Sequence, residues 1–178
     1  MREALKRIIT TCILACVSIL YADAQSHSLG TTYSFGGIGI EYEHDLNPDC
    51  FINAGIRAET ATHFMDSKRE VGVSASLSCN FIIKQWSSRN GNTVSAFAGP
   101  GATFGKSHDF NKDSGYFFGL KGRAGIECRF DRNISISLSF NPILGSHMVI
   151  FDEHIEMNPY KLGLINAVLP EIGINFMF

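Results

Sequence analysis

The sequence ends in Glu171-Ile172-Gly173-Ile174-Asn175-Phe176-Met177-Phe178, a stretch in which apolar and polar residues alternate. Successive side chains of a β-strand point to opposite sides, so such a stretch separates into two faces. The apolar face carries Ile172, Ile174, Phe176 and Phe178. The other face carries Glu171, Gly173 and Asn175. The pattern predicts a strand between an apolar and a polar environment.

The same alternation recurs through the rest of the chain and is clearest in residues 116–130. There the apolar face holds Tyr116, Phe118, Leu120, Ala124, Ile126, Cys128 and Phe130. The opposite face holds Lys121, Arg123, Glu127 and Arg129. Residues 52–59, 71–81 and 134–141 follow the same rule. A barrel wall between lipid and a polar lumen requires this pattern over roughly 9–11 residues per strand.

The chain offers no other way to span a membrane once its first 24 residues are set aside. No later apolar run approaches the roughly 20 residues that a membrane helix needs. We therefore predict an all-β fold, an antiparallel up-and-down transmembrane β-barrel of eight strands. The expected strands are residues 28–35, 38–46, 51–60, 71–83, 93–105, 116–130, 134–145 and 162–178. Residues 28–35 are included because such barrels have an even strand number, with a tight turn at Gly36-Gly37. Pro170 predicts a bulge or break in the last strand.

The expected connections alternate in length, as in outer-membrane barrels with short periplasmic turns and longer outward loops. Short turns fall near residues 47–49, 89–92 and 131–133, and long loops at 60–70, 106–115 and 146–160.

The first 24 residues have the pattern of an export signal. Arg2, Lys6 and Arg7 precede an apolar run, and Ala22-Asp23-Ala24 supplies small residues for cleavage between Ala24 and Gln25. Residues 25–178 then form the barrel domain. A lipobox at residues 13–16 is a rival interpretation, with Leu14 where a small residue is usual. A retained anchor is another.

Composition excludes some functions. The net charge is −2, with no basic patch, so nucleic acid is not expected as a partner. Of five cysteines, three lie beyond the leader, Cys50, Cys79 and Cys128, and at least one of them must be unpaired. Their spacing does not suggest a metal site. Which of them pair, if any, stays open.

Charged residues on the expected lumen face are the main candidate site. They are Glu41, Glu43, Arg57, Glu59, Glu70, Lys121, Arg123, Glu127, Arg129 and Glu171. Because both signs are present, they can form a salt-bridged interior that fixes the barrel. Alternatively, Arg57, Lys121, Arg123 and Arg129 could line a narrow selective pore. No catalytic, cofactor-binding or metal-binding residue is assigned.

The candidates for chemistry are the histidines of the expected outer loops. His63, His108, His147 and His154 lack the spacing of a metal site. Ser146 and His147 are similar in type to the serine and histidine of lipid A deacylases, but that family places His two residues before Ser. Adjacent residues of a strand also point to opposite faces, which separates a nucleophile from its base.

The final octet resembles the assembly signal of outer-membrane barrels: a polar residue, Gly at the third position, and apolar residues at the sixth and eighth. Glu171, Gly173, Phe176 and Phe178 fill these positions. Residues 25–178 as a whole resemble small eight-stranded outer-membrane barrels of the OmpA-type transmembrane or porin-family class. The resemblance implies a place in a bacterial outer membrane, contact with outer-membrane lipid, and insertion by the barrel-assembly machinery. It implies a non-enzymatic structural role or surface-ligand binding through outer loops, with a narrow pore or a lipid A deacylase-like hydrolase as alternatives.

Overall fold

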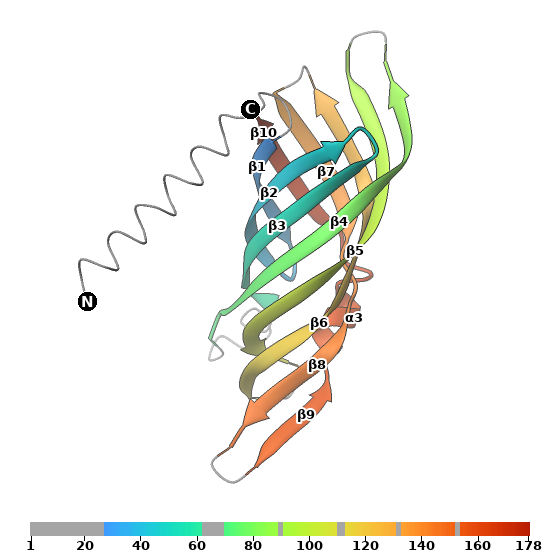
Figure 1. Ribbon diagram of the computed structural model, residues 1–178. Coiled ribbons are helices and arrows are strands. Elements are labelled where there is room, and N and C mark those ends of the chain that lie inside the picture. The colour runs from blue at the N-terminus through green and yellow to red at the C-terminus, as the bar shows by residue number, and fades with distance from the viewer. Residues whose placement is uncertain (1–26, 62–69, 89–90, 110–112, 131–132, 152–153) are drawn as a thin grey trace, which may run out of the picture.

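The computed structural model describes residues 27–61, 70–88, 91–109, 113–130, 133–151 and 154–178. These residues form antiparallel strands and one short helix (Figure 1). The elements are β1 (His27–Ser34), β2 (Gly37–Asn47), β3 (Cys50–Glu59), β4 (Gly72–Ser87), β5 (Thr93–His108), β6 (Ser114–Phe130), β7 (Ile134–Phe140), β8 (Ile143–Ile150), β9 (Ile155–Pro159), α3 (Lys161–Ile165) and β10 (Glu171–Met177).

The ten described strands fill eight positions of a closed wall. Strands β1 to β6 pair in chain order, and β10 closes the ring between β7 and β1. Strand β6 pairs with β7 along one half of its length and with β8 along the other. The predicted eight-stranded antiparallel barrel is therefore confirmed. We call the end with the β2–β3 turn and Phe178 the inner half, and the end with the β8–β9 hairpin the outer half.

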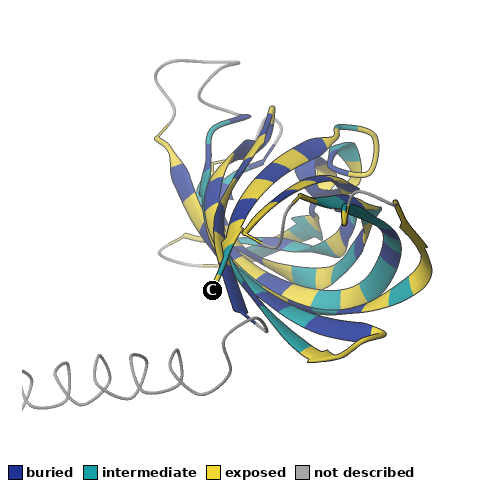
Figure 2. Cartoon of the chain, turned by 90° about the horizontal axis from the view of Figure 1, so that it is seen from above, coloured by how far each residue is buried: buried dark blue, intermediate teal, exposed yellow. Residues whose placement is uncertain are grey.

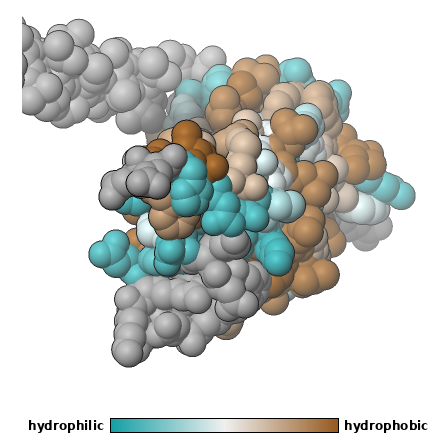
Figure 3. Space-filling model, turned by 90° about the horizontal axis from the view of Figure 1, so that it is seen from below, coloured by the Kyte–Doolittle hydropathy of each residue, from teal (hydrophilic) through white to brown (hydrophobic). Residues whose placement is uncertain are grey.

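Burial alternates along the strands, as bands in the view along the barrel show (Figure 2). In β7, Ser135, Ser137 and Ser139 are almost fully buried, whereas the isoleucines and leucine between them are exposed. Seen from the outer end, hydrophobic surface follows the outside of the wall on the right of the view, and hydrophilic surface lies nearer the middle (Figure 3). The alternation therefore separates a polar lumen from an apolar exterior. None of the described helices is both long enough and apolar enough to cross a membrane.

The predicted first strand is present, and its tight turn lies one residue earlier than the predicted Gly36-Gly37. Strand β1 pairs with β2 on one side and β10 on the other. The two residues that join β1 to β2 are Phe35 and Gly36, because Gly37 already pairs with Ser34. The carbonyl of Gly36 accepts a hydrogen bond from the Thr60 amide at 2.9 Å. A Cβ on Gly37 would overlap the carbonyl of Ala58, so the neighbouring strand can approach only a glycine here.

The last third of the chain departs from the prediction. The expected strand 134–145 is split at Pro142 into β7 and β8. The expected strand 162–178 is wrong before residue 171, because β10 begins directly after Pro170 and residues 161–165 are helical. The expected loop 146–160 instead contains the rest of β8 and all of β9. Proline has no amide hydrogen to give to the ladder, so both breaks fall where the sheet would lose a hydrogen bond.

Helix α3 takes the place of a strand in the wall. The Tyr160 amide before it bonds to the Gly145 carbonyl at 2.9 Å, and the Asn166 carbonyl after it accepts from the Asn141 amide at 3.1 Å. The helix therefore stays attached to the β7–β8 junction. Together β9, α3 and β10 make the eighth position of the wall.

Candidate functional site

The centre of the lumen holds one arginine between two carboxylates. Arg123 of β6 is 2 % exposed and reaches across the barrel to β2. Its two Nη atoms lie 2.9 Å from Glu43 Oε1 and 3.2 Å from Glu41 Oε2. Asn53 of β3 donates to the same two carboxylates at 2.8 and 3.1 Å. One guanidinium supplies positive charge and one amide supplies hydrogen bonds to two buried carboxylates that lie side by side.

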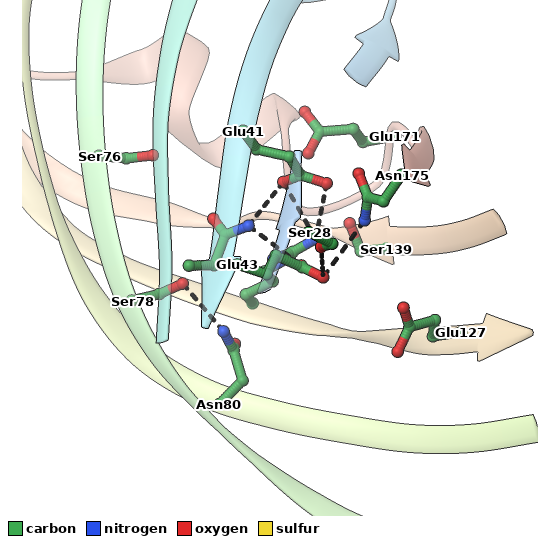
Figure 4. A network of polar contacts seen from close by, with 12 residues as sticks. Ser28, Glu41, Glu43, Ser76, Ser78, Asn80, Glu127, Ser139, Glu171 and Asn175 are labelled. Carbon is green, nitrogen blue, oxygen red and sulfur yellow. Dashed lines mark hydrogen bonds and ion pairs between the residues drawn. The ribbon is translucent and has the colours of Figure 1, made fainter. Parts of the chain in front are cut away.

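Further donors reach Glu43 from the strands that close the barrel. Asn175 of β10 donates to Glu43 Oε2 at 3.2 Å, and Ser28 of β1 lies at 3.5 Å. In the close view, Glu41, Glu43, Asn175 and Ser28 converge on one point from three strands (Figure 4). We call Arg123, Glu41, Glu43, Asn53 and Asn175 the central cluster. It joins β2, β3, β6 and β10 across the lumen.

Glu171 anchors a second group nearer the outer half. It forms an ion pair with Arg57 of β3, and it accepts a hydrogen bond from Asn141 at 3.0 Å. Arg57 also donates to Ser34 of β1 at 2.8 Å. Glu171 is the first residue of the terminal octet, so the polar position of that octet points into the lumen.

A third group lies towards the inner rim. Arg129 donates to both carboxylate oxygens of Asp45, at 2.9 and 3.2 Å, and to Glu127 at 3.0 Å. Sequence reasoning missed Asp45, although it continues the inward alternation of Glu41 and Glu43. About a quarter of the Arg129 and Asp45 side chains is exposed, so this group is far less desolvated than the central cluster.

The remaining predicted charges are placed differently. Glu59 accepts a hydrogen bond from Ser74 at 2.5 Å, and Lys121 donates to Ser76 at 3.2 Å. Both line a lumen cavity of about 30 Å³ together with Glu41, Arg57 and Glu171. Glu70 does not belong to the lumen: it precedes β4 and is exposed, because the strand that would turn it inward starts only at Gly72.

Apolar side chains fill much of the remaining interior. On one side of the central cluster, the Arg123 guanidinium lies 5.2 Å from the centre of the Phe97 ring, which meets Phe51 edge-on. In the outer half an outer apolar plug forms from Ala61, Phe117, Ile143, Tyr160 and Leu162. The rings of Phe117 and Tyr160 stack at 4.3 Å. Tyr160, the last residue of the expected loop 146–160, is 2 % exposed and points inward.

Asp109 holds the plug in place through α3. Its two carboxylate oxygens accept hydrogen bonds from the amides of Lys161 and Leu162, each at 3.0 Å. The helix has no side-chain cap of its own, so this distant carboxylate satisfies amides that would otherwise be orphaned. The β5–β6 connection is thereby tied to the helix in the wall.

The expected outer-loop histidines that the structure describes do not assemble into a metal or catalytic site. His147 is fully buried and bonds through Nε2 to the carbonyl of Ser107 at 2.9 Å, while Ser146 next to it lies on the other face of β8. His154 is exposed and stacks on Phe151. Within the described part of the chain, no three His, Cys, Asp or Glu side chains are placed to hold a metal ion. His63 and the expected cleavage site at Ala24 and Gln25 lie outside the described residues.

The terminal octet completes the wall as predicted from its alternation. In β10, Glu171, Gly173 and Asn175 face the lumen, while Ile172, Ile174 and Phe176 are exposed. The Phe178 amide donates to the His27 carbonyl at 2.9 Å, so the octet is joined to the first described residue.

No protein-family model matches the chain, and neither does any curated protein. Among solved structures it is similar to Ail, the attachment invasion locus protein of Yersinia pestis, at 15% identity and a TM-score of 0.34 over 85% of this chain and 93% of that one. A structure of Ail in complex with the heparin analogue sucrose octasulfate gives 13% identity, 85% and 94% coverage, and a TM-score of 0.34. The fold itself follows from the strand pairing: the chain is an eight-stranded antiparallel β-barrel with a polar lumen and an apolar exterior.

Proposed function

We propose that the chain is an integral barrel protein of a bacterial outer membrane, exported through a leader that is cleaved between Ala24 and Gln25. The apolar exterior supports this, because only lipid accommodates such a surface around a closed barrel. Two aromatic residues with lysine partners mark opposite ends of the apolar band. Lys84 lies 5.2 Å from the Trp86 ring in the inner half, and Lys106 lies 6.0 Å from the Tyr116 ring in the outer half.

The barrel's role, in this proposal, is non-enzymatic: it supports the membrane and presents its outer end to a surface ligand. The observation that carries this is the contrast between a filled lumen and an extended outer sheet. Met148 of β8 pairs directly with Tyr116, and the β8–β9 hairpin continues beyond that level. Ile150 and Ile155, which pair near its tip, are about 60% exposed. We call this pair and the exposed Phe151 the outer hairpin patch.

A pore is the less favourable alternative. A cavity of about 30 Å³ holds on the order of two water molecules, and the outer apolar plug lies beyond it. Ion passage would require both the ion pairs and the plug to move. In a planar lipid bilayer we expect the purified protein to give no ion conductance. Steady single-channel currents that change in Arg123→Met would instead support the pore.

A lipid-modifying hydrolase is also disfavoured. His147 is buried and occupied by the Ser107 carbonyl, and its neighbour Ser146 points away from it. Overexpression should leave the acylation of lipid A unchanged. A change in acylation that His147→Ala abolishes would contradict the non-enzymatic proposal.

Location is tested by fractionating cells that express the full chain. We expect the protein in the outer-membrane fraction, with the mass of a chain that begins at Gln25. It should migrate more slowly on gels after boiling, because boiling unfolds the barrel. Soluble, folded protein in detergent-free buffer would overturn the proposal.

Binding is tested with the purified barrel in lipid discs. Immobilised extracellular-matrix proteins and a lipopolysaccharide-coated surface serve as probes. The double variant Ile150→Ser with Ile155→Ser should be retained less than the unaltered barrel on the probe surface that binds the unaltered barrel. The matched control, Leu144→Ser, removes an exposed apolar side chain of the same β8 strand, two-thirds exposed but lower on the wall. Equal retention of both variants would remove the outer hairpin patch from the binding site.

A further inference from the structure

Two of the three cysteines beyond the leader lie next to each other. Cys50 opens β3 and Cys79 lies in β4, and their Sγ atoms are 3.4 Å apart. Cys50 pairs with Phe81, and Cys79 pairs with Ile52. The two cysteines are therefore diagonal neighbours on the same face of adjacent antiparallel strands.

The third cysteine is out of reach. Cys128 lies in β6 and pairs with Val94 of β5, so strand β5 stands between it and Cys79. Two strand spacings amount to about 9–10 Å, which no disulfide bridges. The spatial arrangement therefore selects one of the three possible pairs, a choice that the spacing of the cysteines along the chain does not make.

We propose that Cys50 and Cys79 form a disulfide that staples β3 to β4 at the inner end of the barrel, and this rests on the proposed export of the chain. Exported proteins meet an oxidising compartment, where two adjacent thiols are oxidised. The S–S bond is about 2.05 Å long, so the sulfurs must approach by roughly 1.4 Å. Cys50 directly follows the turn Asn47-Pro48-Asp49, at the end of its strand.

The turn holds Cys50 close to β4. The Asp49 carbonyl accepts a hydrogen bond from the Ile82 amide at 2.9 Å, which extends the β3–β4 pairing by one residue beyond Cys50. The Asp49 amide donates to Asn47 Oδ1 at 2.9 Å, which fixes the turn itself. Cys50 is 8 % exposed, so oxidation is expected while the chain is still unfolded on its way to the membrane.

The oxidant is a disulfide of the thiol–disulfide oxidoreductase class. The thiolate of Cys50 or Cys79 attacks it to form a mixed disulfide, and the other cysteine then displaces the oxidoreductase sulfur. The two cysteines lose two protons and two electrons in total, and the oxidoreductase leaves as a dithiol. The product closes a loop from residue 50 to residue 79, which fixes the pairing of two central strands before the barrel closes.

The test uses the full chain, exported in cells and recovered from membranes after acid quenching. Free thiols are alkylated in denaturant, then disulfides are reduced and labelled with a second reagent, and the labelled cysteines are identified by peptide mass. We expect the first reagent on Cys128 alone and the second on Cys50 and Cys79. In Cys50→Ser the first reagent should also label Cys79, and in Cys79→Ser it should also label Cys50. In Cys128→Ser the first reagent should label neither of them.

Two results would overturn the disulfide. One is first-reagent labelling of all three cysteines in protein recovered from the outer membrane, which would leave the membrane proposal standing. The other is a disulfide that includes Cys128. If the protein is not exported at all, the proposed function fails instead. Refolding the purified chain in detergent with glutathione disulfide then still tests the pair, because a pair set by the fold should oxidise without export.

Discussion

The inner and outer halves of the barrel fill their narrow interiors with different kinds of side chain. In the inner half, unbroken strands enclose charges, and the buried Arg123 and the partly exposed Arg129 pair with carboxylates of β2. In the outer half, the wall is broken at Pro142 and Pro170, and the interior is closed by the outer apolar plug. The comparison shows that period-two alternation defines which side of the wall a residue faces. It does not define whether the inward side chain is charged or apolar.

Arg123→Met tests the inner half most severely. It leaves Glu41 and Glu43 buried side by side without their cation, so we expect a loss of about 3–5 kcal/mol in unfolding free energy. Urea unfolding in lipid vesicles, followed by the fluorescence of Trp86, the single tryptophan, measures it.

The matched control is Arg129→Met, whose ion pair with Asp45 is partly solvated. It should cost about 1 kcal/mol or less. Adding Glu41→Gln and Glu43→Gln to Arg123→Met should restore much of the loss, because no unpaired charge then remains. Equal midpoints for Arg123→Met and the unaltered protein would show that the central cluster does not hold the inner half together.

Leu120→Arg tests the wall that the two halves share. Leu120 lies near the middle of β6 and is 72 % exposed on the apolar face. A lipid-facing arginine near the bilayer centre costs about 2–4 kcal/mol, and near the interface about 0–1 kcal/mol. Phe130→Arg at the inner end of the same strand should therefore cost much less. Equal losses in the same vesicle assay would mean that Leu120 does not lie near the bilayer centre.

Asp109→Ala tests the outer half and should have the smallest global effect. Loss of the two hydrogen bonds to α3 should cost about 1 kcal/mol, as for the loss of a helix cap. Hydrogen exchange should accelerate at the Lys161 and Leu162 amides and stay unchanged in β7. Asp109→Asn keeps one acceptor oxygen, so its loss of unfolding free energy should be smaller than that of Asp109→Ala but larger than zero. Unchanged exchange at α3 would show that the plug holds the helix without this carboxylate.

The fold was predicted correctly where the residues matched only one secondary-structure pattern. The prediction failed where a stretch matched two patterns equally. The strand β1 and the alternation of β10 follow from period-two burial, and the two glycines after β1 predict its tight turn to within one residue. The helix at residues 161–165 does not follow from the sequence, because a short apolar stretch fits a strand and a helical turn equally. Asp109, which stabilises this turn, lies 52 residues before Lys161.

The interior shows the same limit. Period-two alternation places Glu41, Glu43 and Arg123 on the lumen side of the wall, but it does not predict that they contact one another. That contact depends on the register of β2 and β6 across a closed ring. The alternation also fails to identify Phe51 and Phe117 as residues that fill the lumen, because an apolar residue on the lumen face breaks the pattern. Both are almost fully buried.

The seam between β1 and β10 joins the two ends of the described chain, from Ser28 opposite Met177 to Ser34 opposite Glu171. Nearly the whole sequence must be in position before these strands can meet, so ring closure carries the largest loop entropy of any pairing in the molecule. Until then β1 and β10 both expose unpaired backbone groups that invite pairing with other chains. Damage to the last seven strand residues would therefore convert a self-contained ring into an open sheet that polymerises.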